Sequence, residues 1–379
     1  METFELRGDG VLLSAPSVDD VPRITAICQD TELQRWTAVP VPYTENDAAS
    51  FVTDYALPAW EAGTELTWAV RDPEERRVLG MIGVKREGGN GQLGFWLASD
   101  ARGQRVMSRA VRLVAEYSFS PDGLALSHLI WWAFVGNWDS RRVAWATGFR
   151  IEGTVRGGQT QRGQAVDSWV GSLRAGDPMQ PATRWLNIPV LNGDGLTLRP
   201  WRPDDADAMV EGCSDPRTRY WLSNLSLPYG QEQALAYIQD TWVSAADGTA
   251  VNWAITLADD ESLPVGAVSV VRIRMGRPAF ATIGYWSHPA VRGSGVMSRA
   301  LGLAVRHAFA ATESGGLGLD RLELGRAEGN DASAHVAETN GFRHIGRVRA
   351  AEPLGDGTLV DLHRYDLLPS DLLPSDLHG

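Results

Sequence analysis

In the second half of the chain, apolar residues recur in some stretches at the spacing of a β-strand and in others at the spacing of a helix. Val296, Ala300, Leu303, Ala304 and His307 recur at helical spacing, which predicts a helix over 295–311. The same patterns predict further helices from 203, over 231–246 and over 332–339, and strands at 196–199, 252–257, 265–274, 281–287, 321–326, 343–351 and 359–367. Strands and helices in this mixed order indicate an α/β fold, a sheet covered by helices.

Most of the chain is an internal repeat. "ARGQRVMSRA" in the first half matches "VRGSGVMSRA" in the second, and the offset between the copies grows only from about 185 to about 194 residues. Other landmarks hold the same register, namely Cys28 with Cys213, Trp36 with Trp221, Trp68 with Trp253, Asn137 with Asn330 and Ser140 with Ser333. We therefore expect two homologous domains.

The composition changes between the two copies. The stretch "LRAGDPMQPATRWLNIPVLNGDG" is rich in Pro and Gly and lacks a periodic apolar pattern, which is typical of a linker. We expect a first domain over 1–175, a linker over 176–192 and a second domain over 193–368. The last residues, "LLPSDLLPSDLHG", contain a short repeat, and we expect a mobile tail over 369–379.

Composition narrows the class of protein. The chain has 379 residues, 44% of them hydrophobic, which allows a large buried core. It shows no secretory signal and no apolar run that would span a membrane, so we expect a cytoplasmic protein without a membrane partner. The net charge of −12 argues against a nucleic-acid partner and favours cationic ligands. Cys28 and Cys213 occupy equivalent places and fit buried apolar positions better than a disulfide or a zinc site.

The repeated loop lies between a predicted strand and the predicted helix over 295–311. Gly293 and Gly295 come directly before this helix. A helix N-terminus presents unpaired N–H groups and a partial positive charge, and glycines let an anion such as pyrophosphate approach them closely. The alternative is an ordinary glycine-rich turn, because such short matches are common without function.

The flanks of this loop carry a family resemblance. "GYWSHPAVRGSGVMSRAL", with "EGNDASAHVAETNGF" about 40 residues later, resembles the GNAT superfamily of acetyl-CoA-dependent N-acetyltransferases. Within it, the closest similarity is to the branch that acetylates ribosomal-protein N-termini and related amines. The resemblance covers both copies. It implies two tandem GNAT folds, each a mixed, mostly antiparallel sheet flanked by helices, with acetyl-CoA as cosubstrate and no metal.

The resemblance also implies a set of coenzyme-binding residues. Residues 292–297 fill the family pattern Arg/Gln-x-x-Gly-x-Gly/Ala, with Met297 at the last place as in some members of this branch. In the family, backbone amides of this loop hold the CoA pyrophosphate, and the preceding strand pairs with the pantetheine arm. The implied residues are Trp286, Ser287, His288, Arg292, Gly293, Ser294, Gly295, Val296, Met297, Ser298, Asn330 and Ser333.

Acetyl transfer requires that the amine lose a proton and that the leaving thiolate gain one. The resemblance implies that Ser333, in the Asn330-x-x-Ser333 motif, serves the thiolate and that Glu352 draws the amine proton. Tyr285 is a candidate for the acceptor site. As alternatives, Asn330 and Ser333 serve only as helix caps, Glu352 is a solvated carboxylate and Tyr285 is a core residue. Neither motif contains a cysteine, which favours direct attack by the amine.

The first copy differs at two of these positions. Arg105 replaces the counterpart of Gly295, and Gln159 stands where Glu352 would be. A side chain at 105 occupies the space that phosphates need, although a guanidinium also binds phosphate. We expect the first domain to be degenerate and kept for structure or substrate recognition. Two alternatives are that both domains are active and that the chain is a non-catalytic acyl-CoA sensor or scaffold.

The sequence indicates the acceptor and the assembly state less directly than it indicates the coenzyme. Candidate acceptors are the primary amine of an aminoglycoside or another antibiotic, a polyamine, an amino acid, or a peptide N-terminus. A fused tandem already provides the pairing that single-domain relatives reach by association. We therefore expect a monomer or at most a weak homodimer.

Overall fold

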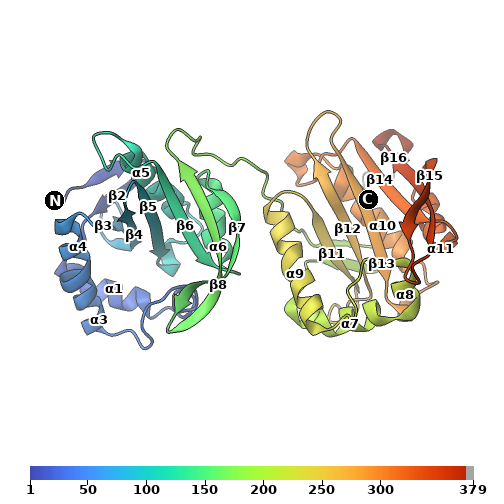
Figure 1. Ribbon diagram of the computed structural model, residues 1–379, viewed down its shortest axis with the longest axis horizontal. Coiled ribbons are helices and arrows are strands. Elements are labelled where there is room, and N and C mark those ends of the chain that lie inside the picture. Colours follow the sequence, from blue (N-terminus) through green and yellow to red (C-terminus); the bar gives the residue numbers. More distant parts are fainter. Residues whose placement is uncertain (373–379) are drawn as a thin grey trace. The chain divides into compact units, whose positions relative to one another are not determined.

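The computed structural model describes residues 1–372 and divides into two compact units. Unit 1 spans Met1–Ala182, and unit 2 begins at Thr183 (Figure 1). Residues 373–379 of the predicted tail lie outside the described residues. Over the described part of the chain, no helix has the length and apolar character needed to cross a membrane.

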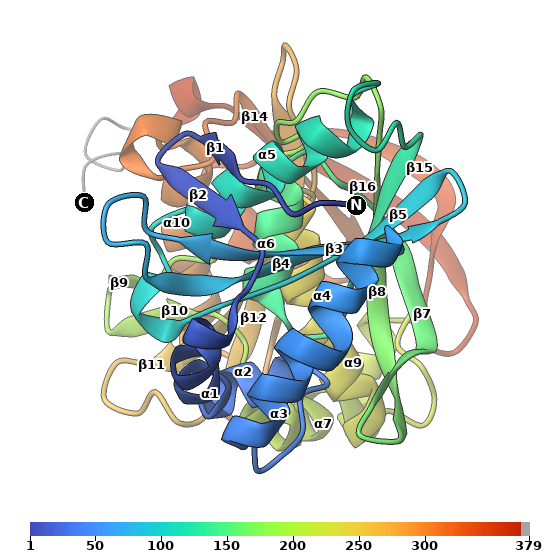
Figure 2. The same ribbon diagram turned by 90° about the vertical axis from the view of Figure 1, so that its left-hand side faces the viewer.

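Unit 1 contains one eight-stranded sheet with helices packed on it (Figure 2). The strand order is β1-β2-β3-β4-β5-β6-β8-β7, and only β5 and β6 pair in parallel. The strands are β1 (Leu6–Gly8), β2 (Val11–Ser14), β3 (Glu65–Arg71), β4 (Val78–Glu87), β5 (Asn90–Leu97), β6 (His128–Phe134), β7 (Arg150–Gln161) and β8 (Gln164–Arg174). The helices are η1 (Val18–Asp20), α1 (Val21–Cys28), α2 (Thr31–Trp36), α3 (Glu45–Ser50), η2 (Phe51–Ala56), α4 (Leu57–Ala62), η3 (Ser99–Ala101), α5 (Val106–Phe119) and α6 (Trp138–Ala146).

Unit 2 repeats this arrangement. Its strand order is β15-β16-β14-β13-β12-β11-β10-β9, and only β13 and β14 pair in parallel. The strands are β9 (Leu191–Gly193), β10 (Leu196–Arg199), β11 (Val251–Leu257), β12 (Gly266–Arg274), β13 (Phe280–Ser287), β14 (Arg321–Ala327), β15 (Arg343–Pro353) and β16 (Leu359–Leu367). The helices are η4 (Pro203–Asp205), α7 (Ala206–Ser214), α8 (Pro216–Trp221), α9 (Gln231–Ala246), η5 (Pro289–Val291), α10 (Val296–Phe309), η6 (Thr312–Ser314), α11 (Asp331–Thr339) and η7 (Pro369–Asp371).

The shared topology confirms the prediction of two mixed, mostly antiparallel sheets flanked by helices. Helix α9 and strand β16 begin and end at the predicted residues. The prediction missed α8 and β9. Leu186, in the stretch predicted as linker, is buried in the core of unit 2, and Pro189 accepts a hydrogen bond from the Trp253 indole at 2.8 Å.

Side-chain alternation along β11 separates two apolar layers of unit 2. Trp253 and Ile255 pack on one face with α10 and α11, whereas Ala254 packs on the other face with α7 and α9. Small residues on the second face leave room for Trp201, which is fully buried there. A sheet covered on both faces follows from this period of two.

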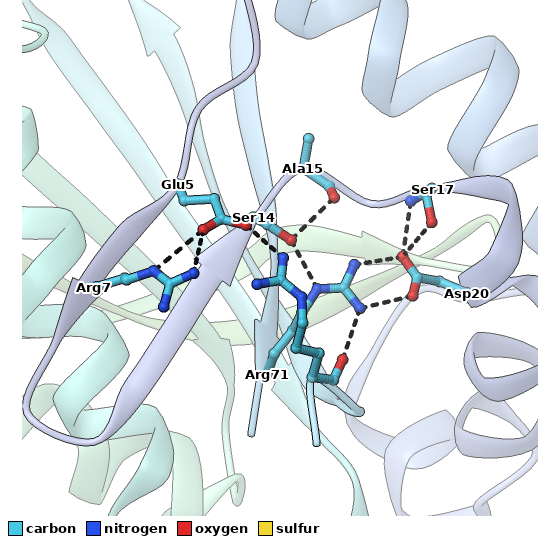
Figure 3. Close-up of polar contacts among 8 residues, drawn as sticks. Glu5, Arg7, Ser14, Ala15, Ser17, Asp20 and Arg71 are labelled. Atoms are coloured by element: carbon cyan, nitrogen blue, oxygen red, sulfur yellow. Dashed lines mark hydrogen bonds and ion pairs between the residues drawn. The ribbon is translucent and has the colours of Figure 1, made fainter. Parts of the chain in front are cut away.

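A buried ion pair fastens the first helical segment of unit 1 to its sheet. The Asp20 carboxylate accepts hydrogen bonds from two guanidinium nitrogens of Arg71, at 2.8 and 2.7 Å (Figure 3). It also accepts the Ser17 N–H at 2.8 Å, which closes a capping box. Burial alone would raise the pKa of Asp20, but the hydrogen bonds from Arg71 and Ser17 lower it below its ordinary value.

Unit 2 contains the same ion pair with its cation on a different strand. Asp205, the counterpart of Asp20, binds two guanidinium nitrogens of Arg199, both at 2.8 Å. Arg199 lies on β10, at the place of Ser14 in unit 1, whereas Arg71 lies on the neighbouring strand β3. Arg199 and Asp205 are almost completely buried. Both units therefore share the ion pair, although the arginine comes from a different strand in each. A buried aspartate needs a cation, and either strand can supply it.

Asp205→Asn should lower the free energy of unfolding of unit 2 by about 3 kcal/mol, because Arg199 would remain buried without its counterion. Urea unfolding followed by tryptophan fluorescence measures this change. Asp204→Asn is the matched control, since Asp204 is exposed, and it should unfold like the wild type. Equal stability of the two variants would contradict the prediction.

Candidate functional site

A gap opens in the sheet of unit 2 between the two parallel strands. β13 and β14 pair only at Phe280–Arg321, Ala281–Leu322 and Thr282–Glu323. Beyond Thr282, β13 continues to pair with β12, while β14 pairs with β16 through Ala327. The β13 edge that faces β14 therefore has no strand partner over Gly284–Ser287 among the described residues. Such an edge can pair with an extended ligand.

Three predicted residues lie at the end of this free edge. Trp286 and Ser287 pair with Ala267 and Gly266 of β12 on their other side. The Trp286 ring packs against α7, where a Cβ at Gly212 would lie only 2.5 Å from it. His288 is buried, and its Nδ1 accepts the Ala290 N–H at 3.3 Å. The side chains of Trp286 and His288 thus anchor the segment in the protein, and the main chain is the part that faces the gap.

The repeated loop of unit 2 ends where α10 begins. Gly295 is the N-cap of α10 with φ +74°, and Gly293 has φ +75°. Nothing lies within 4 Å of the place where a Cβ would stand on either glycine. The first N–H groups of a helix have no partner within the helix. Open space therefore adjoins the positive end of a 14-residue helix.

The Arg292 side chain binds the protein itself. Its guanidinium donates to the Asp215 carboxylate and to Thr218 Oγ1, the latter at 2.8 Å. Asp215 is also the N-cap of α8 and accepts the Thr218 N–H at 2.9 Å. The hydrogen bond from Arg292 lowers the pKa of Asp215 to about 2. Arg292 thus ties the loop to α8, as Arg102 ties the corresponding loop of unit 1 to Asp30.

The Asn330–Ser333 motif lies on the opposite wall of the gap. The Asn330 side chain accepts the Ser333 N–H at 3.2 Å and caps α11. The Tyr285 hydroxyl lies 3.0 Å from the Ser333 carbonyl oxygen, to which it donates, and 3.2 Å from Ser333 Oγ. Burial raises the pKa of Tyr285 to about 12, so its hydroxyl stays protonated at neutral pH. The capping role is therefore real, and the Ser333 hydroxyl still has a protonated neighbour.

Glu352 lies on an irregular part of the β15–β16 hairpin. Val348 pairs with Leu362 and Glu352 pairs with Val360, so the register shifts between them. Glu352 is half-buried, and burial raises its pKa above the ordinary value. A carboxylate with a raised pKa is better suited to accept a proton near neutral pH.

Helix α8 connects the parts of the site and is what the sequence reasoning missed. Its Tyr220 carbonyl oxygen accepts the Gly355 N–H at 2.8 Å, which fixes the turn of the hairpin that carries Glu352. Asp215-Pro216 was the signal that could have found it, because Asp at the N-cap and Pro at the first position begin many helices. A pocket of about 240 Å³ lies between α8 and this turn, lined by Pro216, Arg219, Tyr220, Leu222, Ser223, Leu225, Leu227, Gly355 and Asp356.

The corresponding site of unit 1 is built from the same elements but differs in the side chains at the candidate functional positions. Arg105 is the N-cap of α5 with φ +57°, a left-handed conformation that costs a non-glycine residue about 1 kcal/mol. The Ser140 hydroxyl accepts the indole N–H of Trp131 at 3.1 Å. Gln159 pairs with Val166 at the register shift where Glu352 pairs with Val360. The counterpart of Ser333 is thus engaged by a core tryptophan.

Comparison with known proteins adds a family match. A model of the acetyltransferase (GNAT) domain matches residues 11–150 and again residues 195–343, well over half of the chain. Similar solved structures include Mycobacterium smegmatis RimJ in complex with CoA-disulfide, 23% identical, covering 51% of this chain and 93% of that one with a TM-score of 0.44. A putative ribosomal-protein-serine acetyltransferase from Vibrio cholerae is 17% identical, covering 45% and 97% with a TM-score of 0.42.

A third similar structure is the microcin C7 self-immunity acetyltransferase MccE in complex with acetyl-CoA and AMP. It is 19% identical, covers 46% of this chain and 93% of that one, and has a TM-score of 0.39. A search of curated protein sequences finds no match. Among the described residues, no three or more His, Cys, Asp or Glu side chains are grouped to hold a metal ion.

Asp215→Asn should destabilise unit 2 by about 1.5 kcal/mol at neutral pH, because the hydrogen bonds to Arg292 and Thr218 lose their charge. The folded-state pKa of about 2 lies below the ordinary 3.8. The charge-dependent stability is therefore complete above 3.8 and is lost as the pH falls through 2. Urea unfolding across this range should show the gap between the variant and the wild type closing. Asp259→Asn, at an exposed position, is the control.

Proposed function

The chain belongs to the GNAT acetyltransferase family, and from this premise we propose that its second unit transfers the acetyl group of acetyl-CoA to a primary amine. The observation that carries the proposal is the loop before α10. Gly293 and Gly295 both have positive φ, and each borders open space at the helix N-terminus. A Cβ on either residue would enter that space. This is the arrangement that a diphosphate requires, because it binds main-chain N–H groups at close range.

The gap between β13 and β14 indicates which other residues bind the coenzyme in this proposal. The free edge of Trp286, Ser287 and His288 suits β-like pairing with the amide groups of a pantetheine arm. The N–H groups of Gly293 to Ser298 suit the diphosphate. Arg292 keeps the loop in place through Asp215. Acetyl-CoA, once bound, supplies an acetyl group already activated as a thioester.

Glu352 and Ser333 provide the proton transfers. Glu352 accepts a proton from the acceptor ammonium, for which its raised pKa suits it. The Ser333 hydroxyl donates a proton toward the leaving sulfur and regains one from the attacking nitrogen, which loses its second proton as the C–S bond breaks. The Tyr285 hydroxyl donates to the Ser333 carbonyl oxygen, lies 3.2 Å from Ser333 Oγ and holds this group in place. Neither motif contains a cysteine, which supports direct attack by the amine.

Unit 1 serves structure or substrate recognition in this proposal. Three differences support this: Arg105 at the N-cap of α5, Gln159 at the position of the base, and Ser140 bound to the Trp131 indole. Glutamine cannot accept the proton, and the partner of the Ser140 hydroxyl is a buried indole where Ser333 has a tyrosine hydroxyl. If both units were catalytic, none of these three differences could impair the reaction in unit 1.

A cationic amine is the proposed acceptor, either a small molecule or a peptide N-terminus. The net charge of −12 favours the approach of cations over that of anions. A panel of aminoglycosides, polyamines, amino acids and basic peptides, each incubated with acetyl-CoA while free thiol is read, tests both the reaction and the acceptor class. If none of these amines leads to release of thiol and acetyl-CoA also fails to bind, the proposal is contradicted.

Calorimetric titration with CoA should give one site per chain. Gly295→Arg, which copies unit 1, should weaken binding at least about 100-fold, because the side chain fills the space before α10 and several N–H contacts are lost. Arg105→Gly is the matched substitution in unit 1 and should leave the affinity of the unit 2 site unchanged. Two sites in the wild type would contradict a degenerate unit 1.

Glu352→Gln should lower kcat by about 100-fold or more while CoA affinity stays unchanged, because the amide cannot accept the amine proton. The acid limb of kcat/KM for the wild type should lie above the ordinary glutamate value of 4.5, with activity lost as the pH falls through it. Steady-state kinetics with the best amine of the panel measure both. Gln159→Glu in unit 1 is the control and should not change kcat.

A further inference from the structure

We propose that Asp361, on β16, is a positioning residue for the reaction. It holds the irregular segment of β15 that carries Glu352, and its main chain holds the turn that leads to Ser333. The inference rests on the proposed function, because it concerns how the proposed base and the proposed acid are held at the same site. None of the sequence patterns points to this residue.

The segment before Glu352 needs to be held. Between the pairs Val348–Leu362 and Glu352–Val360, β15 advances four residues while β16 advances two. Ala350, inside this bulge, has φ +47°, a left-handed conformation that costs an alanine about 1 kcal/mol. A bulge of this kind re-aims the side chains that follow it, and the strain persists only where neighbouring contacts maintain it.

The Asp361 carboxylate supplies those contacts across the bulge. Its Oδ1 accepts the Ala350 N–H at 2.9 Å, and its Oδ2 lies 3.1 Å from Nε of Arg347. The Asp361 side chain is 20% exposed and that of Arg347 is 53% exposed, so solvent weakens the ion pair. The bond to the strained Ala350 amide is therefore the one that sets the geometry.

The main chain of the same residue reaches the other half of the site. The Asp361 carbonyl oxygen accepts the Glu328 N–H at 2.9 Å. Glu328 lies two residues before Asn330, whose side chain caps α11 at Ser333. Asp361 thus connects the strand segment that carries the proposed base with the turn that carries the proposed acid. A shift of about 1 Å between such groups is enough to cost a large part of the rate.

Unit 1 contains the same contacts without the base. The Asp167 carboxylate accepts the Gly157 N–H at 2.8 Å, and its carbonyl oxygen accepts the Val135 N–H at 2.9 Å. Gly157 has φ +60°, which glycine adopts without strain. The bulge in unit 1 leads to Gln159. Unit 1 therefore offers a control in which the same interaction is removed away from the proposed chemistry.

The test compares Asp361→Ala, Asp361→Asn and the control Asp167→Ala in the full chain. Asp361→Ala should lower kcat by about 10- to 100-fold with little change in CoA affinity, because the bulge relaxes while the loop before α10 is untouched. Its acid limb should move toward lower pH, since a displaced Glu352 becomes better solvated. Asp361→Asn keeps an oxygen for the Ala350 N–H and should retain most of the rate. Asp167→Ala should leave kcat unchanged.

The outcomes separate this inference from the proposed function. Wild-type kcat and an unshifted acid limb in Asp361→Ala, together with collapse of activity in Glu352→Gln, would overturn the positioning role alone. Full activity in Glu352→Gln would overturn the proposed base and this inference with it. An Asp361→Asn variant as slow as Asp361→Ala would also contradict the inference, because the bond to Ala350 would then not be what matters. Calorimetric CoA binding establishes that unit 2 is folded in the two Asp361 variants, and urea unfolding followed by tryptophan fluorescence checks Asp167→Ala.

Discussion

The parallel pairing of β13 and β14 ends after three residue pairs, and the site depends on that ending. β14 pairs with β16 from Leu322 to Ala327 but with β13 only as far as Glu323, so β13 and β14 diverge beyond that residue. The divergence leaves main-chain groups of β13 without a strand partner and places the loop before α10 on one side of the gap and the start of α11 on the other. In unit 1 the pairing of β5 and β6 likewise ends, at Leu93 and Trp131. The gap is thus a property of the fold, and its chemistry depends on the residues placed around it.

The two units keep contacts more faithfully than positions. The buried aspartate of each unit binds a guanidinium, yet Arg71 and Arg199 come from different strands. The physical reason is that an unpaired buried carboxylate costs several kcal/mol, whereas the strand that supplies its cation makes little difference. At the loop, both the positions and the contact are kept: Arg102 binds Asp30, the N-cap of α2, and Arg292 binds Asp215, the N-cap of α8.

At one pair of facing positions in the sheet, the two units distribute large and small side chains differently. Trp131 pairs with Gly171 at the place where Leu324 pairs with Tyr365 in unit 2. A Cβ at Gly171 would lie 3.2 Å from the Trp131 ring, so the glycine makes room for the larger neighbour. The indole N–H then takes the Ser140 hydroxyl as its acceptor. The change at this pair thus gives the serine hydroxyl a different partner without altering the strand pairing.

The sequence by itself determined the duplication, the order of the elements and the local signals. Helix α9, the glycines before α10 and the Asn330 cap could all be predicted, because periodicity and capping act over a few residues. Only the tertiary structure decided the partners: Asp215 for Arg292, Ser333 for the Tyr285 hydroxyl, and Asp361 for the strained Ala350 amide. These contacts join different elements of the fold, through directions that only the twist and register of the folded sheet set.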